Sequence, residues 1–301
     1  MAVWGTGYVA TKLGLQYAPP FTFLTLRFSL GLLCLAPVVA LWPPRWPQTR
    51  TELGHVALAG LLMHAVQLGA SHYAQYLGMS AGVTALVIST QPLLTAIIAS
   101  RWLRARLAPG QWAGVAIGLA GVALVVWHKI DLREVTVASF AATVIAVLGV
   151  TAATLYQRIF APQVDLKAAA VIQFAASAAL LAPLALTVEG FAVRWSWALF
   201  GAIAFLVIFA SFLAVSALHV LMRHGEATRV TSLMYLPPIF AVLAELALFH
   251  VVPSALTLAG IAVTCAGVAM TVWTSCFRKK SKRLTPEKWT KEPSNAPRTH
   301  P

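Results

Sequence analysis

A long segment of this 301-residue chain occurs twice. A shift of 146 positions aligns residues 80–127 with residues 226–273 without a gap. Nine of the sixteen positions in segment 112–127 are then identical, and Pro92 falls on Pro238. Repeats of this length are a signal at the level of the fold. The chain is therefore a tandem duplication, and its fold must be built from two related halves.

The composition shows what is duplicated. Hydrophobic residues make up 59% of the chain and charged residues 10%, against about 25% charged residues in soluble domains. Such a chain cannot cover a water-soluble surface, so we predict that it lies in a lipid bilayer. Apolar runs bounded by proline, glycine and charge predict ten membrane spans. They lie near residues 2–17, 20–42, 53–77, 82–103, 110–128, 137–160, 168–187, 197–218, 229–249 and 254–275.

We predict an all-α integral membrane protein with ten transmembrane helices in two inverted five-helix repeats. The repeats are residues 1–128 and 137–275, and a basic disordered cytoplasmic tail follows at 276–301. The first run is shorter than the ~20 residues that a spanning helix needs. It is either a thin, tilted helix or part of a truncated one, and it lacks the features of a signal peptide.

The distribution of charge predicts the orientation. Eight of the 22 Lys and Arg residues lie in segment 278–298, which is typical of a cytoplasmic tail that faces anionic lipid and argues against a nucleic-acid partner. With this tail inside, 17 basic residues face the cytoplasm, 3 lie outside and 2 lie within spans. We therefore expect both termini in the cytoplasm. Because five spans per repeat is an odd number, the second repeat is inverted, which is the signature of secondary transporters with a site near the membrane midplane.

Short motifs recur in order in both halves. They are Trp4-Gly5, Lys12, Arg27, Pro92 and Gly114 to Gly121 in the first half, and Tyr235-Leu236-Pro237-Pro238 and Gly260 to Gly267 in the second. With these motifs the chain resembles the EamA branch of the drug/metabolite transporter (DMT) superfamily. The resemblance implies a bacterial inner-membrane carrier without a cofactor, commonly an exporter of amino acids or other small metabolites. Many members carry a glutamate where this chain has Ala105 and Val251, so no role is transferred to these positions.

Polar residues on the third span are the first candidates for a substrate-binding site. His64, Gln67, Ser71 and Gln75 fall within an arc of about 80° on an α-helix, and His72 borders this stripe. Such residues can also be ordinary polar contacts between packed helices. Their number on one face favours a hydrated central cavity.

Three further polar residues are candidates for substrate binding. Gln91 precedes Pro92, which frees a backbone carbonyl in the fourth span. Tyr156 and Gln173 occupy the positions of Lys12 and Arg27 in the second half. Tyr156 has an alternative interpretation as part of an interfacial aromatic belt.

Lys12, Arg27 and Glu245 are predicted about 6 to 10 Å below the outer helix ends. We interpret Glu245 as the partner of Lys12 or Arg27 in an ion pair that closes the outer side, which leaves the other cation for a substrate carboxylate. The alternatives are charges that extend separately to the lipid headgroups, or proton coupling by Glu245. Coupling is weaker because a shallow position should leave Glu245 hydrated.

Other functions are less well supported. The three cysteines have no metal-ligand spacing, and no catalytic motif occurs, so we expect no enzyme and no metal site. A lipid-linked sugar or drug flippase is the second transport hypothesis, and an intramembrane enzyme or sensor the third. The expected partners are a small-molecule substrate and the bilayer, with the chain a monomer or homodimer. Glycines at every fourth residue assign the fifth and tenth spans to helix packing or dimer contact.

Overall fold

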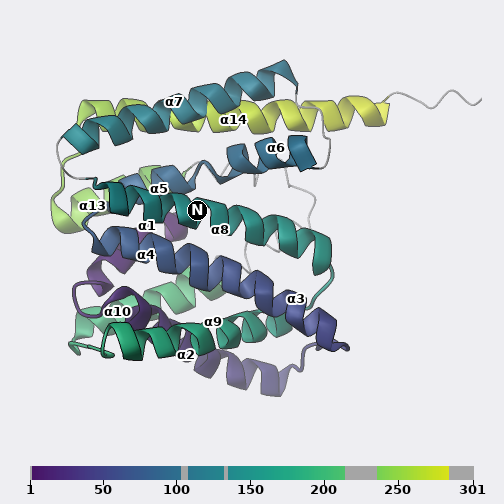
Figure 1. Cartoon of the computed structure of the whole chain (residues 1–301), viewed down its shortest axis with the longest axis vertical. Helices are drawn as coiled ribbons and strands as arrows, with labels where there is room; N and C mark the ends of the chain where they lie inside the picture. Colours follow the sequence, from purple (N-terminus) through teal and green to yellow (C-terminus); the bar gives the residue numbers. More distant parts are fainter. Residues whose placement is uncertain (1, 103–107, 132–134, 214–235, 285–301) are drawn as a thin grey trace, which may run out of the picture.

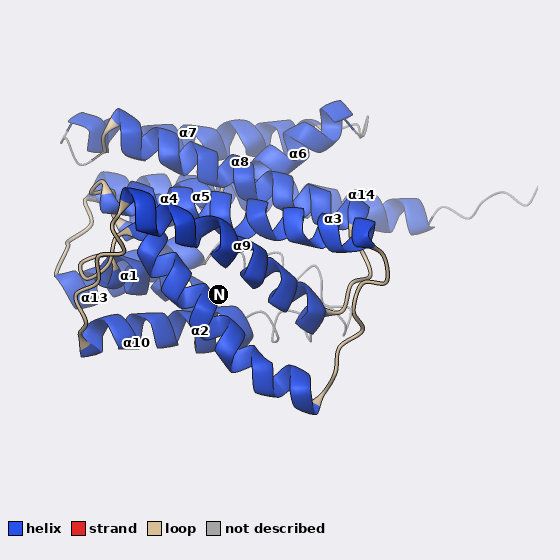
Figure 2. Cartoon of the chain, turned by 60° about the horizontal axis from the view of Figure 1, so that its bottom comes forward, coloured by secondary structure: helices blue, strands red, loops and turns tan. Residues whose placement is uncertain are grey.

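The computed structural model describes residues 2–102, 108–131, 135–213 and 236–284, and all regular structure within them is helical. The helices lie side by side, and the loops between them gather at two ends (Figures 1 and 2). In chain order they are α1 (Ala2–Gly14), α2 (Pro20–Leu41), α3 (Arg50–Gly60), η1 (Leu61–Leu68), α4 (Gly69–Tyr76), α5 (Ala81–Ile88), α6 (Gln91–Trp102), α7 (Pro109–Asp131), α8 (Val137–Phe160), α9 (Leu166–Val188), α10 (Trp197–Phe205), η2 (Leu206–Leu213), α13 (Pro237–Phe249) and α14 (Ala255–Leu284).

The two ends of the bundle are named here by their predicted sides. Loops 77–80 and 189–196 lie at the predicted outer end, on the left in Figure 1. Loops 42–49 and 161–165 lie at the predicted inner end. Many helices begin with a side chain that accepts a backbone N–H of the first turn, which stabilises a helix by about 1 kcal/mol. These N-cap residues are Thr49, Ser80, Thr136, Asp165 and Ser196.

Six helical segments in the described part of the chain are long and apolar enough to cross a membrane. They are Pro20–Leu41, Arg50–Tyr76, Ala81–Ile98, Pro109–Trp127, Val137–Phe160 and Leu166–Val188, with shorter apolar helices at Trp197–Leu213, Pro237–Phe249 and Ala255–Thr271. The all-helical membrane fold is therefore confirmed, whereas the count of ten spans stays a prediction. The eighth and ninth predicted spans continue into residues 214–235, which lie outside the described residues. Helix α14 runs to Leu284, so the predicted start of the tail at residue 276 falls inside it.

The predicted fourth span, near residues 82–103, is interrupted at its centre. Helix α5 ends at Ile88, and α6 begins at Gln91. Pro92 has no N–H and cannot continue the hydrogen-bond pattern of α5. The hydroxyls of Ser89 and Thr90 instead donate to backbone carbonyls three residues earlier, each at 2.6 Å. The fourth span therefore contains a break with two helix ends.

The third and eighth predicted spans each contain a π-helical segment, η1 and η2. Their first residues, Leu61 and Leu206, lie 145 positions apart, close to the repeat shift of 146. A π-helix bonds each residue to the fifth along rather than the fourth. The 100° rotation per residue used to place His64 and Gln67 on one face with Ser71 therefore does not apply within η1.

Helices α7 and α14 pack against each other along their lengths at one side of the bundle (Figure 1). A Cβ added at Gly114 would lie 2.7 Å from the carbonyl oxygen of Gly267, and one added at Gly121 would lie 2.8 Å from that of Gly260. Contacts this short exclude any side chain, so these glycines allow the backbones to touch. The predicted role in helix packing is confirmed. The reversed order of the contacts shows that the two helices are antiparallel.

The remaining helices also pack across the two halves. Helix α2 packs on α9, and α5 packs on α13. Helix α1 contacts α10 and α13, while α8 contacts η1, α4, α5 and α6. Buried polar side chains lie at these boundaries between the halves.

Candidate functional site

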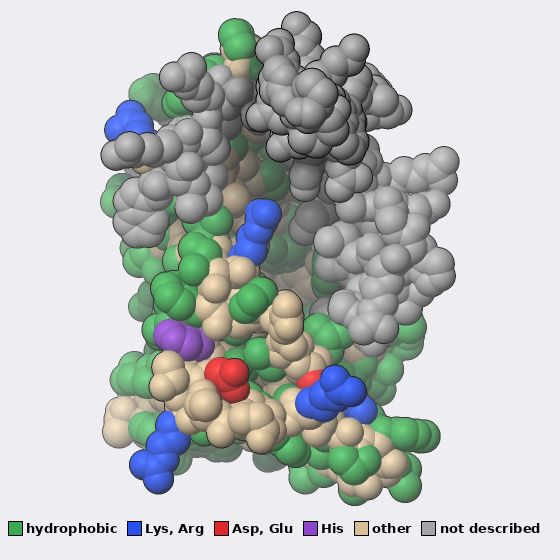
Figure 3. Space-filling view, turned by 90° about the vertical axis from the view of Figure 1, so that its right-hand side faces the viewer, with side chains coloured by type: hydrophobic (Ala, Val, Ile, Leu, Met, Phe, Trp, Pro, Cys, Tyr) green, Lys and Arg blue, Asp and Glu red, His purple; other side chains and the backbone are tan. Residues whose placement is uncertain are grey.

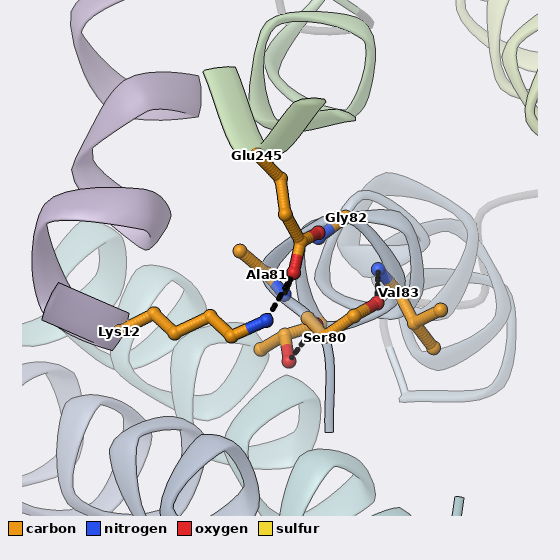
Figure 4. Close-up of polar contacts among 7 residues, drawn as sticks. Lys12, Ser80, Ala81, Gly82, Val83 and Glu245 are labelled. Carbon is orange, nitrogen blue, oxygen red and sulfur yellow. Dashed lines mark hydrogen bonds and ion pairs between the residues drawn. The ribbon is translucent and has the colours of Figure 1, made fainter. Parts of the chain in front are cut away.

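An ion pair joins α1 and α13 at the predicted outer end. Lys12 Nζ lies 2.5 Å from Glu245 Oε1 (Figure 4). The Glu245 side chain is 4% exposed, and that of Lys12 is 27% exposed. The predicted pairing of Glu245 is confirmed, with Lys12 as its partner. The expectation that Glu245 is hydrated was wrong, because neighbouring helices cover the carboxylate.

The Glu245 carboxylate also caps helix α5. It accepts the N–H of Ala81 at 3.2 Å and the N–H of Gly82 at 3.0 Å (Figure 4). A helix N-terminus carries partial positive charge that favours an anion. Lys12 Nζ in turn lies 5.1 Å from the ring centre of Phe249. The contact therefore ties together α1 and α5 of the first half and α13 of the second.

Arg27 lies on α2, apart from this ion pair. The residue is 9% exposed, and its Nη2 donates to Ser211 Oγ on η2 at 3.3 Å. Its Nε finds no acceptor among the described residues. Arg27 is thus the cation that the Lys12–Glu245 pair leaves without a carboxylate in the described part of the chain.

His64 on η1 lies near Arg27 on α2 and Gln173 on α9. Its ring packs against Phe28 and Phe174, with centroid distances of 5.4 and 5.2 Å. Gln173 is the counterpart of Arg27 in the second half. The structure therefore brings three predicted residues, Arg27, His64 and Gln173, into one neighbourhood.

His72 lies on α4 and contacts α1. Its Nε2 is 3.5 Å from Thr11 Oγ1, and its Nδ1 is 3.4 Å from Ser71 Oγ. Its ring also lies 5.8 Å from that of Phe23. The charge of Arg27 acts on both His64 and His72. His72 therefore connects α4 to α1 through Thr11, and Ser71 contacts the other nitrogen of its ring.

The other predicted glutamines are more scattered. Gln67 and Gln75 are buried, and neither polar atom of the Gln75 side chain has a partner within the described ranges. A buried polar group without a hydrogen bond is costly and calls for an explanation. Gln91 Nε2 donates to Thr154 Oγ1 on α8 at 3.2 Å, beside the break between α5 and α6.

Tyr156 lies toward the predicted inner end of α8. Its hydroxyl lies 2.6 Å from His55 Nδ1 on α3, and Phe160 packs against both rings. Tyr156 therefore links the two halves, as Lys12 does, but through a different kind of bond.

Two cavities open at the predicted inner end, which faces the viewer in Figure 3. One has a volume of about 940 Å³ and lies between the two loops of this end; its polar lining includes Arg45, Glu52, Asp165 and Lys167. The other, of about 320 Å³, is lined by Met63, Thr154, Gln157, Arg158, Ala161 and Pro162. Neither is lined by Arg27 or Glu245.

Sequence reasoning missed three residues. Ser211 lies in an apolar run, but it stands one position from the repeat counterpart of His64, which was a usable signal. His55 lies near the start of a predicted span, where a histidine is ordinarily solvated. Glu189 follows the seventh span and accepts the N–H groups of Phe21 and Thr22 at 3.0 and 2.7 Å. Such contacts between loop and helix end depend on tertiary structure.

The comparisons with known proteins agree with this arrangement. The model of the EamA-like transporter family matches residues 1–127 and again residues 137–273. A solved crystal structure superimposes with a TM-score of 0.63 at 19% identity and covers 91% of this chain and 95% of that one. At this identity the likeness concerns the fold alone.

The relatives are named as transporters. The uncharacterized inner membrane transporter YedA of Escherichia coli (strain K12) is 30% identical over 251 residues, which cover 80% of this chain and 78% of that protein. The uncharacterized transporter YvbV of Bacillus subtilis (strain 168) is 25% identical, with 82% and 81% covered. A probable amino-acid metabolite efflux pump of Salmonella typhimurium is 28% identical over 48% of this chain and 46% of its own length. The chain belongs to the EamA-like transporter family of membrane proteins.

Proposed function

We propose that this protein is a ten-helix secondary transporter of the bacterial inner membrane that exports amino acids or related small metabolites by alternating access. Both termini lie in the cytoplasm, as the 17 basic residues on that side predict. The partial match to a probable amino-acid metabolite efflux pump supports the substrate class.

The pattern of packing supports two inverted repeats. Helix α1 contacts α10 and η2, and its counterpart α8 contacts α3 and η1, which are the counterparts of α10 and η2. Each such contact between the halves therefore has a partner in which the roles of the halves are exchanged. Transporters built in this way rock one half against the other around a central site.

The observation that carries the proposal is the buried Lys12–Glu245 pair between the two halves. We assign this pair the role of an outer gate, closed when the central site is open to the cytoplasm. When the pair breaks, Lys12 and Glu245 are left as buried charges without their partner. Opening of the gate therefore needs another interaction that stabilises these charges. Lys12 can also meet substrate as the gate opens.

The transport path follows from the remaining polar residues. We place it along the residues that line the boundary between the halves from the outer end to the centre and inner side. These are Gln75, His72, Ser71, Gln67, His64, Arg27, Gln173, Gln91 and Tyr156. The hydrogen bonds that several of these residues form with neighbouring helices are also typical of ordinary packing, and cysteine labelling distinguishes the two interpretations.

Export is tested in a bacterial strain that overexpresses the chain. Metabolites in the medium are measured by mass spectrometry against the empty vector and against Glu245→Gln at equal membrane abundance. We expect at least one amino acid or related metabolite to accumulate outside the cells with the parent chain and to fall with the variant. A correctly inserted chain that exports none of them would contradict the proposal.

The path is tested by cysteine labelling. Cysteines at His64, Gln67, Ser71 and Gln75 should react with a small polar thiol reagent, and the exported compound should protect them. Cysteines at Leu61 and Tyr73 are the matched controls, and we expect these to react more slowly. Equal labelling at all six positions would favour the packing interpretation.

A further inference from the structure

Within the described residues, Arg27 is a buried cation that uses little of its hydrogen-bonding capacity. Its guanidinium donates to Ser211 at 3.3 Å, and its Nε has no acceptor in the described ranges. Arginine stays charged in proteins and carries five N–H donors in a fixed plane. A buried charge is ordinarily paired, because desolvation without compensation is costly. The position therefore calls for an anion that the described residues do not supply.

Glu245, the carboxylate within the predicted spans, is already engaged. Glu245 binds Lys12 and two backbone N–H groups, so its acceptor sites face α1 and α5. Among the described residues, Lys12–Glu245 is the only ion pair between side chains. The residues placed around Arg27, namely Ser211, His64 and His72, include no acid.

The charge and shape of Arg27 define the ligand. One cation is neutralised by one negative charge, whereas a doubly charged phosphate would leave a buried negative charge uncompensated. The Nε–H and the adjacent Nη2–H are parallel donors that match the two oxygens of a carboxylate. The aromatic rings of Phe28 and Phe174 beside His64 favour an apolar body attached to that carboxylate.

We infer that the transported molecule carries a single carboxylate group and that Arg27 binds it through Nε and Nη2, displacing Ser211 from the guanidinium. This inference rests on the transport function proposed above. Because the described residues around Arg27 include no acid, an amino group on the ligand is not required for recognition. The substrate class is therefore small apolar monocarboxylates, with or without an α-amino group.

The first test uses the purified full chain in lipid nanodiscs and measures thermal stabilisation by matched probes. The probes are leucine and phenylalanine, the corresponding acids without the amino group (4-methylpentanoate and 3-phenylpropanoate), and the two amino-acid amides. We expect carboxylates to stabilise the chain, with or without the amino group, and the amides to have no effect. Arg27→Gln, which installs the residue found at the equivalent position 173, should weaken carboxylate binding about tenfold or more. Arg27→Lys should weaken it less, because lysine keeps the charge but loses the fork of donors.

Stabilisation by the amides, equal binding by Arg27→Gln, or no stabilisation by any carboxylate would overturn the inference.

A second measurement does not depend on the choice of probe. Ser211→Cys is introduced after Cys34, Cys265 and Cys276 have been replaced by alanine, and it is labelled with anionic and cationic thiol reagents of equal size.

With Arg27 present, the anionic reagent should react about tenfold faster than the cationic one, because the field of the cation concentrates anions. With Arg27→Gln this preference should disappear. Equal rates with Arg27 present would overturn the inference even if the first test were positive. Export of a compound without a carboxylate would leave the proposed transport function intact and refute only this assignment. Carboxylate binding without export would support this assignment and contradict the proposed transport function.

Discussion

Lys12 and Tyr156 occupy equivalent positions in the two repeats, yet they hold the two ends of the bundle by different bonds. Lys12 forms an ion pair with Glu245 at 2.5 Å, whereas Tyr156 forms a hydrogen bond with His55 at 2.6 Å. The counterpart of Glu245 under the repeat shift is Ala99, so the equivalent positions in the other half cannot form an ion pair. Hydrogen bonds to charged groups contribute about 1.5–3 kcal/mol, and neutral ones about 1 kcal/mol. On the proposed cycle this difference makes the outer end harder to open than the inner end.

The comparison depends first on which end of the bundle faces the periplasm. Reporter fusions test this, and each fusion should report one side of the membrane only. Reporter fusions after Lys129 and Arg194 should report the periplasm, and fusions after Arg104 and within the tail should report the cytoplasm. Activity of paired alkaline phosphatase and green fluorescent protein fusions measures this. Finding Lys129 and Arg104 on the same side would end the argument for inverted repeats.

Removing the outer ion pair should have the next largest effect. In Glu245→Gln the closed outer end should lose about 2 kcal/mol, or roughly 30-fold in its population. A cysteine at Gln75 should then react about 30-fold faster with an impermeant reagent added outside, by the same estimate, and export should fall.

The control and the partner mutation make this test specific. Glu189→Gln alters another carboxylate that caps a helix across the halves, and it should leave this labelling nearly unchanged. Adding Lys12→Gln to Glu245→Gln should restore part of the export, because no unpaired charge remains. Lost accumulation with exchange preserved would instead favour proton coupling by Glu245.

Copying the ion pair to the inner end should reduce the difference between the ends. The double variant Ala99→Glu, Tyr156→Lys places both charges at the equivalent positions, and we expect it to slow export about tenfold by stabilising a second closed end. Export kinetics measure this, with Tyr156→Lys alone as the control. A double variant that exports no more slowly than this control would show that the equivalent positions are too far apart to pair.

The smallest effect is expected from the inner hydrogen bond. His55→Phe keeps the ring packed against Tyr156 and Phe160 but removes the bond, so the population of the closed inner end should fall about threefold to tenfold. Labelling of a cysteine at Gln157 from the cytoplasmic side measures this, with Arg45→Gln as a control on a nearby loop. An effect as large as that of Glu245→Gln would mean that the two ends are equally strong.

The parts of the fold that follow from local pattern could be predicted from the sequence. Composition and the repeat gave the helical membrane fold, and the span 137–160 coincides with α8. The break near Pro92 and the π-helical segment at Leu61–Leu68 were missed, because hydropathy measures the length of an apolar run and not the hydrogen-bond pattern within it.

The candidate site was predicted less completely. Depth along the helices indicated that Glu245 pairs with Lys12 or Arg27, but only packing shows which cation it binds. The depth argument also failed for hydration, since three elements cover the carboxylate. His55 carried no local signal, and Ser211 could be found only through the repeat, because their roles depend on helices more than 100 residues away.

The glycine contacts between α7 and α14 bear on how such a molecule can arise. Gly114 meets Gly267, and Gly121 meets Gly260, while the repeat shift converts the first contact into the second. An interface in which each patch contacts its own counterpart is isologous, as in a twofold homodimer. Two separate copies of a five-helix ancestor, inserted in opposite orientations, would already share this seam. Gene fusion would then have joined the two subunits of an existing dimer. A later change to the Lys12–Glu245 pair at one end only would have made the two ends of the protein different.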